Sequence, residues 1–413
     1  MNTDLMNKVF LVHVLKEIAM NNDVYKPGLD VHTPVFINGH SVEIPILKIL
    51  QHDGSVFSGA ELPEIDQALA TKIYKSFVFH RVLDERMVAS QRQGRLSFYM
   101  AALGEEAASI GGAAGLKPQD MIMAQYREQG ALIYRDFSLE DFMNQMFSNE
   151  KDLGKGRQMP IHYGSKKLNY MTISSPLATQ IPQASGYAYG QKLQGLDAVT
   201  LCYFGDGAAS EGDFHAGLNM AAVHKAPVIF FCRNNGYAIS TPSDEQYSGN
   251  GIASRGVGYG IKTIRIDGND ILAVLKATQA AREYAVKEHK PVLIEAMSYR
   301  LGAHSTSDDP SGYRTREEEE KWQEHDPVLR MKIWMMNNNW WDGTQENELT
   351  EQYREQILAA VKVAEKIDKP SIDSLITDVY DKPTEQLIRQ LDELKNHIKK
   401  YPDAYPLTAG IIK

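Results

Sequence analysis

The chain has 413 residues, of which 43% are hydrophobic and 23% are charged, and 44 Lys and Arg against 53 Asp and Glu give a net charge of −9. This composition is that of an average globular protein and is unlike that of disordered, collagen-like or coiled-coil chains. The acidic balance disfavours a general nucleic-acid-binding protein, because such proteins present a basic surface. The longest apolar stretches, such as residues 226–232, are far shorter than the roughly 20 residues of a membrane span.

The first 65 residues are expected to form an N-terminal extension that includes a helical stretch around residues 5–20. The start of the chain has neither the apolar core of a secretory signal nor the Arg-rich, acid-poor composition of a transit peptide. Two cysteines cannot form a disulfide framework, so Cys202 and Cys232 are interpreted as small buried apolar residues in a reducing compartment. A cytoplasmic bacterial protein is therefore expected, or a protein of the mitochondrial matrix if the source is eukaryotic.

Four short apolar segments in the second half of the chain read as buried strands, and the segments between them carry apolar side chains at helical spacing. Strands that alternate with single helices form parallel βαβ units. An α/β fold with a doubly wound, mostly parallel sheet is therefore predicted over residues 66–330, and packing helices with a tail are expected over residues 331–413. The four strand segments cover residues 198–204, 228–232, 262–266 and 292–297.

Polar residues follow the first two of these strands. Asp206 comes directly after the first strand, and Asn235 follows the second. Both are expected at the carboxyl edge of the sheet, where such folds bind ligands. Carboxylate and amide oxygens suit Mg²⁺, which usually completes its coordination with water and substrate phosphates. Gly205 and Gly207 allow close approach to the backbone, and a helix starting after Gly207 would offer N–H groups to an anion. A metal-bridged diphosphate site is predicted.

The spacing of these residues narrows the choice of diphosphate. A dinucleotide fingerprint is excluded because Ser210 stands where its third glycine is required. The sequence instead has Gly205-Asp206-Gly207, 26 further residues, and then Asn234-Asn235. Gly-Asp-Gly alone is more often a plain turn, but this spacing on a βαβ frame is similar to the thiamine-diphosphate-binding motif. We therefore expect a sheet of the thiamine-diphosphate-binding type.

Longer motifs extend this similarity over residues 73–380. They lie at residues 91–95, 97–100, 125–128, 154–160, 173–180, 205–212, 232–240, 304–309 and 313–314. With them the sequence resembles the alpha subunits of branched-chain 2-oxo acid dehydrogenase complexes, the thiamine-dependent decarboxylase component. The resemblance departs from the family pattern at Ala101-Ala102-Leu103 and at Ala303. These departures leave open the alpha subunits of pyruvate and acetoin dehydrogenases, which share the shorter motifs.

Position by position, the resemblance implies thiamine diphosphate, Mg²⁺ and a monovalent cation such as K⁺ as cofactors. Mg²⁺ would be held by Asp206, Asn235 and the carbonyl of Tyr237. The positions implied to contact thiamine diphosphate are Tyr126, Arg127, Ser175, Leu177, Gly207, Ala208, Arg233 and His304. Those implied to hold the monovalent cation are Ser174, Pro176, Thr179 and Gln180, for which an ordinary proline-containing loop is the alternative. The planar fork of an arginine suits phosphate oxygens, although an isolated arginine is more often part of a surface ion pair.

His304 is the implied catalytic residue, in a polar loop beyond the last predicted strand. An imidazole that titrates near neutrality can orient, donate or accept a proton. Without the motif, a loop histidine is more often a solvated surface residue. Ser305 and Thr315 resemble positions that are phosphorylated in eukaryotic relatives, where a phosphate would add about two negative charges.

The implied activity is the thiamine-dependent oxidative decarboxylation of a 2-oxo acid, in branched-chain amino acid catabolism, with transfer of the acyl group to the lipoyl group of an acyltransferase partner. In this family the glutamate that activates the aminopyrimidine comes from a separate beta subunit. An α₂β₂ heterotetramer with an active site at the subunit interface is therefore expected, and the chain alone is expected to be inactive. The alternative from another class is a non-catalytic scaffold subunit that kept the fold.

Overall fold

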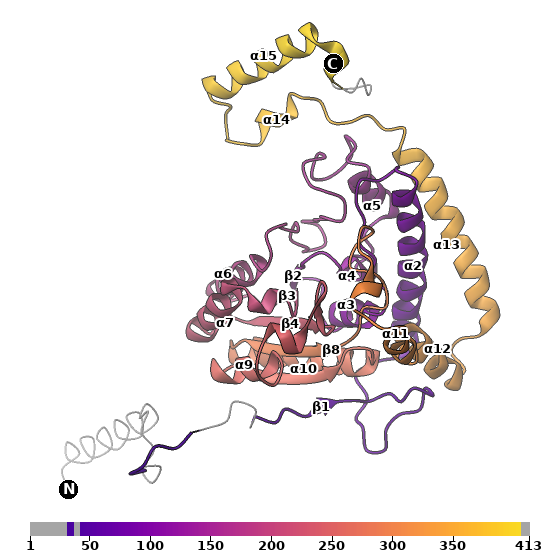
Figure 1. Ribbon diagram of the computed structural model, residues 1–413, viewed down its shortest axis with the longest axis vertical. Coiled ribbons are helices and arrows are strands. Elements are labelled where there is room, and N and C mark those ends of the chain that lie inside the picture. The colour runs from indigo at the N-terminus through magenta and orange to yellow at the C-terminus, as the bar shows by residue number, and fades with distance from the viewer. Residues whose placement is uncertain (1–30, 37–41, 406–413) are drawn as a thin grey trace. The chain divides into compact units, whose positions relative to one another are not determined.

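The computed structural model describes residues 31–36 and 42–405. The chain divides into two compact units, Met1–Val42 and Glu43–Lys413, and the helix expected around residues 5–20 lies outside the described residues. In the second unit six strands form one parallel sheet in the order β1-β7-β8-β4-β3-β2 (Figure 1). In chain order they are β1 (Ile46–Leu47), β2 (Met121–Met123), β3 (Thr200–Gly205), β4 (Val228–Asn234), β7 (Lys262–Asp267) and β8 (Val292–Met297). The predicted α/β fold with a mostly parallel sheet is confirmed.

Both faces of the sheet are buried, because the side chains of β3 pack alternately into two different hydrophobic cores. Leu201 and Tyr203 belong to one hydrophobic core, whereas Cys202 and Phe204 belong to the other. Successive side chains of a strand point to opposite faces, so the two cores lie on opposite sides of the sheet. Helices α6 (Gln180–Leu193) and α7 (Gly212–His224) supply the core around Cys202. The opposite core draws on α2 (Gln67–Arg92), α3 (Glu106–Ala114), α4 (Gln129–Tyr134), α5 (Leu139–Met146), α10 (Ile271–Glu288) and α13 (Gly343–Ala364).

The four predicted strands match β3, β4, β7 and β8, and both cysteines are fully buried as expected. The edge strands β1 and β2 were not predicted, because two or three residues are too few to show periodicity. Strand β1 pairs with β7, and Ile49 and Leu50 behind it are buried in the core. The compact unit thus begins at Glu43, well before the boundary at residue 66 that the sequence suggested.

Short polar caps set the ends of the main helices. Asp66 accepts a hydrogen bond from the backbone N–H of Leu69 at the start of α2, and Asp270 caps α10 in the same way. The helix expected directly after Gly207 begins later: a 3-10 turn at Ala208–Ser210 comes first, and α7 starts at Gly212.

The other strands and α-helices of the described residues are β5 (Tyr237–Ala238), β6 (Thr241–Pro242), α8 (Ser243–Gln246), α9 (Ala253–Gly258), α11 (Arg316–Gln323), α12 (Pro327–Asn337), α14 (Ser374–Thr377) and α15 (Glu385–Lys400). Helices α12 and α13 pack against α2 (Figure 1), which agrees with the packing helices expected after residue 330. Among the described residues, no helix combines the length and the apolar character that crossing a membrane requires.

Candidate active site

The structure places Asp206 and Asn235 beside each other at the carboxyl edge of the sheet. Asp206 follows β3 and Asn235 follows β4, and these two strands are paired through Gly205 and Arg233. Both side chains are buried. Gly236 next to Asn235 has a φ of +82°, which side chains rarely tolerate. This turn lets the backbone N–H of Tyr237 donate to Oδ1 of Asn235 at 3.1 Å.

Asp206 is a buried carboxylate without an ion-pair partner among the described residues. The side-chain amide of Gln246 lies 3.5 Å from Oδ2 of Asp206. Burial raises the pKa of Asp206 to about 6, with a further contribution from the charge of Glu105. Gly207 beside it lies so close to the β5–β6 hairpin that an added Cβ would meet the Cβ of Ala238 at 3.0 Å. The Asp206 carboxylate therefore lies in a tightly packed turn, in a position to bind a cation.

Two arginines expected to bind the cofactor lie next to this edge, and buried glutamates hold them. Arg233 donates to Glu128 at 2.6 Å and to Glu105 at 2.7 Å, and the Nε of Arg127 lies 3.8 Å from the same Glu105. All four side chains are almost fully buried. Burial disfavours the charged form of Glu105, but attraction by Arg233 and Arg127 outweighs it, so the pKa of Glu105 is lowered. Sequence reasoning assigned no role to either glutamate.

His304 lies between Arg127 and a third buried arginine, Arg300. A nitrogen of each guanidinium approaches Nδ1 of His304, at 3.2 and 3.4 Å respectively. Because guanidinium groups only donate, Nδ1 accepts and the proton of the neutral ring is on Nε2. Burial, together with the charges of Arg127 and Arg300, lowers the pKa of His304 to about 4. The expectation that His304 titrates near neutrality is therefore wrong for this chain: the ring is neutral there.

The loop that carries His304 is fixed by Asp308. This carboxylate accepts hydrogen bonds from the backbone N–H of His304 and from the hydroxyl of Tyr313, both at 2.7 Å. The hydroxyl of Tyr313 also lies 2.9 Å from Arg300. The ring of Tyr126, another expected cofactor contact, lies edge-on to that of His304 with centroids 6.2 Å apart. Tyr126, Arg127, Arg233, Asn235 and His304 are thus linked in one network.

The loop before α6 forms a second group of expected site residues. The hydroxyl of Ser175 donates to Nε2 of His162 at 2.7 Å, and Nδ1 of this buried histidine lies 3.1 Å from the carbonyl of Pro160. Leu177 is 41% exposed. Thr179 lies within hydrogen-bond distance of the Ser174 hydroxyl and the Pro176 carbonyl. The side chain of Gln180 donates to the carbonyl of Tyr203 in β3 at 3.0 Å, which ties the loop to the strand before Asp206.

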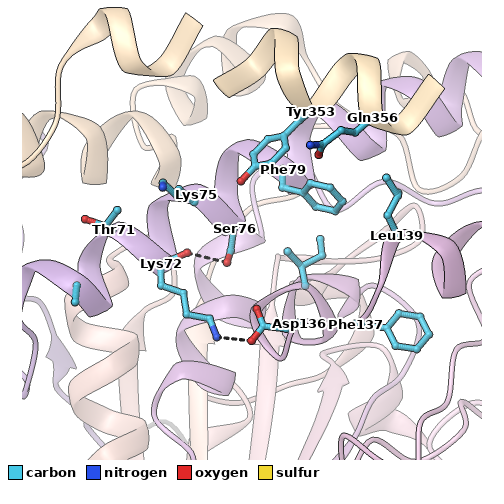
Figure 2. Close-up of a pocket in the computed structure, with 12 residues that line it drawn as sticks. Thr71, Lys72, Lys75, Ser76, Phe79, Asp136, Phe137, Leu139, Tyr353 and Gln356 are labelled. Carbon is cyan, nitrogen blue, oxygen red and sulfur yellow. Dashed lines mark hydrogen bonds and ion pairs between the residues drawn. The ribbon is translucent and has the colours of Figure 1, made fainter. Parts of the chain in front are cut away.

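A pocket of about 630 Å³ lies elsewhere, between α2, α13 and the corner that joins α4 to α5 (Figure 2). Lys72 forms an ion pair with Asp136 there at 2.8 Å, and Phe79 and Tyr353 form part of the wall. Since no expected site residue lines it, it is separate from the candidate active site.

The residues of the site fit a diphosphate bridged by a divalent cation. Three buried guanidiniums, those of Arg127, Arg233 and Arg300, lie in this network with the carboxylates of Glu105, Glu128 and Asp308. The planar fork of an arginine donates to phosphate oxygens, so these groups suit an anionic ligand. The carboxylate of Asp206 and the amide oxygen of Asn235 are hard donors suited to Mg²⁺. Within the described ranges there is no group of three or more His, Cys, Asp or Glu that could hold a metal ion.

Comparisons with known proteins agree with this geometry. Residues 74–373 match the family model described as "Dehydrogenase E1 component". The chain is 50% identical over 365 residues to a mouse protein named "2-oxoisovalerate dehydrogenase subunit alpha, mitochondrial", with 88% of this chain and 83% of that protein covered. The protein of the same name from Dictyostelium discoideum is 53% identical over 366 residues, with the same shares covered. An Arabidopsis thaliana relative, "2-oxoisovalerate dehydrogenase subunit alpha 2, mitochondrial", is 46% identical over 399 residues, 95% of this chain and 84% of its own length.

The fold is α/β, and the chain belongs to the dehydrogenase E1 component family. Within that family its relatives include the proteins named 2-oxoisovalerate dehydrogenase subunit alpha. The resemblance drawn from the sequence motifs is thereby confirmed, and so is the expectation of an oxidoreductase of the 2-oxo acid dehydrogenase type.

Proposed function

We propose that the chain is the alpha subunit of the decarboxylase component of a branched-chain 2-oxo acid dehydrogenase complex. It takes part in the thiamine-dependent oxidative decarboxylation of 2-oxo acids and in transfer of the acyl group to the lipoyl group of an acyltransferase partner. The observation that carries the proposal is the network of the buried Arg127, Arg233 and Asn235 with the half-buried His304, beside Asp206. A scaffold subunit would have no need to keep so many charged groups buried, since each costs desolvation energy.

Thiamine diphosphate, when bound, supplies the carbon nucleophile and the electron sink for decarboxylation. Asp206, Asn235 and the carbonyl of Tyr237 hold Mg²⁺, while Arg127 and Arg233 donate to phosphate oxygens. Gly207 and Ala208 bring the backbone close to the diphosphate. Tyr126, Ser175 and Leu177 contact the cofactor, and the group of Ser174, Pro176, Thr179 and Gln180 holds a monovalent cation such as K⁺.

His304 acts in this proposal as a neutral hydrogen-bond donor through Nε2–H. Its Nδ1 is occupied by Arg127 and Arg300, so only Nε2 is left to face substrate or the lipoyl group. A neutral imidazole between two guanidiniums does not take up a second proton at pH 7. It therefore orients a reacting oxygen or sulfur and can release the Nε2 proton to it, with Arg127 and Arg300 favouring the negative charge left behind.

The beta subunit completes the site by supplying the glutamate that activates the aminopyrimidine, in an α₂β₂ heterotetramer, and the chain is inactive without it. The names of the relatives, which include "mitochondrial", support the mitochondrial matrix as location; the bacterial cytoplasm stays the alternative prediction. Ser305 is half-buried, and its phosphorylation, like that of Thr315, stays a prediction.

Reconstitution with a beta subunit tests the function directly. The full chain, co-purified with that subunit, is assayed for decarboxylation of 3-methyl-2-oxobutanoate and of pyruvate at equal concentrations, with thiamine diphosphate and Mg²⁺. We expect faster turnover of 3-methyl-2-oxobutanoate and no turnover by the alpha chain alone. Equal or faster turnover of pyruvate would place the chain with the pyruvate or acetoin enzymes, and no turnover of either acid would contradict the proposed activity.

A further inference from the structure

Glu105 is a buried carboxylate at the centre of the site, and the proposed chemistry assigns no task to it. It is 1% exposed, and it lies at the start of α3, far along the chain from the residues it touches. Its Oε1 accepts hydrogen bonds from Arg233 at 2.7 Å and from the side-chain amide of Asn235 at 3.2 Å. Its Oε2 has no hydrogen-bond partner among the described residues and lies 3.8 Å from Nε of Arg127.

We propose that Glu105 is a positioning residue that turns the amide oxygen of Asn235 toward the divalent cation and holds Arg127 and Arg233 around the diphosphate. The inference rests on the proposed function, since it assumes that the site takes a diphosphate bridged by a cation.

The orientation of the Asn235 amide follows from its two neighbours. An ionised carboxylate only accepts hydrogen bonds, so the NH₂ group of Asn235 must face Glu105. At the other end, the backbone N–H of Tyr237 donates to Oδ1 at 3.1 Å. Both constraints fix the same orientation, with the amide oxygen on the side of the turn that carries Tyr237, whose carbonyl is the third expected cation ligand. Without Glu105 only the N–H of Tyr237 orients the amide, and its nitrogen loses its acceptor.

The same carboxylate sets the geometry of the two arginines. Arg233 uses Nε for Glu128 and one terminal nitrogen for Glu105, so the plane of its guanidinium is fixed while the other terminal nitrogen remains for phosphate oxygens. Arg127 is held on the opposite side through its contact with Oε2. Glu105 is thus the carboxylate that contacts both arginines, and together with Glu128 it offsets the repulsion between their two positive charges.

The next residue offers a matched control. Glu106 is also 1% exposed; it forms an ion pair with the half-buried Arg81 at 2.9 Å and accepts a hydrogen bond from the backbone N–H of Gly104 at 2.9 Å. Neither partner belongs to the proposed binding machinery. Glu106→Gln therefore removes a carboxylate of equal burial from the same helix start without touching Asn235, Arg127 or Arg233.

The test compares Glu105→Gln with Glu106→Gln in the full chain co-purified with a beta subunit. Calorimetry measures the dissociation constant of thiamine diphosphate at saturating Mg²⁺ and, separately, the Mg²⁺ concentration that gives half-maximal cofactor binding. Thermal unfolding without ligands reports the structural cost of each change. We expect Glu105→Gln to raise the half-saturating Mg²⁺ concentration about 10- to 100-fold, as outer-shell changes do, and Glu106→Gln to change it less than about twofold.

Two outcomes would overturn the inference. Equal Mg²⁺ and cofactor binding by Glu105→Gln and the wild type shows that Glu105 serves the fold alone, and equal weakening by both variants shows a general loss of structure. If Glu105→Gln does not fold, Glu105→Asp keeps the charge but shortens the reach to Asn235; it should again shift the Mg²⁺ requirement, and unchanged binding by it contradicts the inference. Failure of the wild type to bind thiamine diphosphate would instead contradict the proposed function.

Discussion

The two parts of the candidate site differ in how the chain holds them. At the strand ends, Asp206, Asn235 and Arg233 are buried, and carboxylates from distant segments fix the arginine. In the loop before α6, by contrast, Ser175 and Leu177 are exposed, and short local hydrogen bonds provide most of the order. The strand-end part is therefore preorganised for an anion by this chain alone, whereas the loop part has apolar surface left for a cofactor or a partner subunit to cover.

The largest effect is expected from Arg233→Ala, which removes the cation that Glu105 and Glu128 share. Leaving buried carboxylates without their partner costs about 3–5 kcal/mol of stability, and the cofactor loses one of its phosphate donors. Denaturant unfolding of the apo protein measures the stability. Arg282→Ala is the control: it breaks a buried ion pair with Asp120 of 2.6 Å outside the site and should cost similar stability without weakening cofactor binding. A loss below about 1 kcal/mol for Arg233→Ala would contradict the view that this network organises the strand ends.

Asp206→Asn should weaken cofactor binding without lowering the stability of the apo protein. Asp206 has no ion-pair partner among the described residues, and burial raises its pKa to about 6, so its charge does not support the apo fold. We expect Mg²⁺-dependent cofactor binding to fall more than about 100-fold, while the unfolding temperature of the apo protein at pH 7.5 stays equal or rises.

The control for this change is Asp267→Asn at the end of β7, a strand of the same sheet that β8 and β4 separate from β3. Asp267 is paired with Arg330 at 2.9 Å, so its neutralisation should lower the unfolding temperature and leave cofactor binding intact. Calorimetry measures cofactor binding by both variants, and thermal unfolding measures their stability. Unchanged Mg²⁺-dependent binding by Asp206→Asn would contradict the metal assignment.

A smaller, pH-dependent effect is expected from His304. An unfolded histidine titrates near pH 6.5, whereas Arg127, Arg300 and burial lower the pKa of the native residue to about 4, against the opposite pull of Asp308 and Glu105. The unfolded chain thus binds more protons between these values, and stability falls as the pH falls from about 6.5 to 4. Above pH 6.5 this contribution is fully present.

His304→Gln should flatten that part of the stability profile by up to one proton, retain cofactor binding and lose most acyl transfer to a lipoyl acceptor. Unfolding curves from pH 4.5 to 8 and NMR of the labelled ring provide the measurements. A midpoint near 6.5 for His304 in the folded protein would show that the two arginines do not surround it as described, and wild-type acyl transfer by the variant would remove its catalytic role.

The sequence predicted the residues at the strand ends better than the buried glutamates that hold them in place. Asp206 and Asn235 could be placed together because parallel strands end at one edge of the sheet, a rule that needs only the strand pattern. Glu105 and Glu128 could not be assigned to the site from the sequence, because they contact Arg233 across 128 and 105 residues of chain. Hydrophobic periodicity does not indicate which buried charged residues contact one another. The lowered pKa of His304 could not be predicted from the sequence for the same reason, since it depends on Arg300 as well as on the expected Arg127.

Ser175→Ala should give the smallest effect and probes the loop part of the site. The change removes the hydroxyl that donates to Nε2 of the buried His162 at 2.7 Å, and one hydrogen bond of this kind is worth about 1 kcal/mol. Ser311→Ala is the control: its hydroxyl bonds Asp309 at 2.7 Å on an exposed loop, where the loss should be below about 0.5 kcal/mol. Denaturant unfolding of the apo protein compares the two. If Ser175→Ala cost as much as Arg233→Ala, the loop would be as firmly built into the fold as the strand ends, and the contrast between the two parts of the site would not hold.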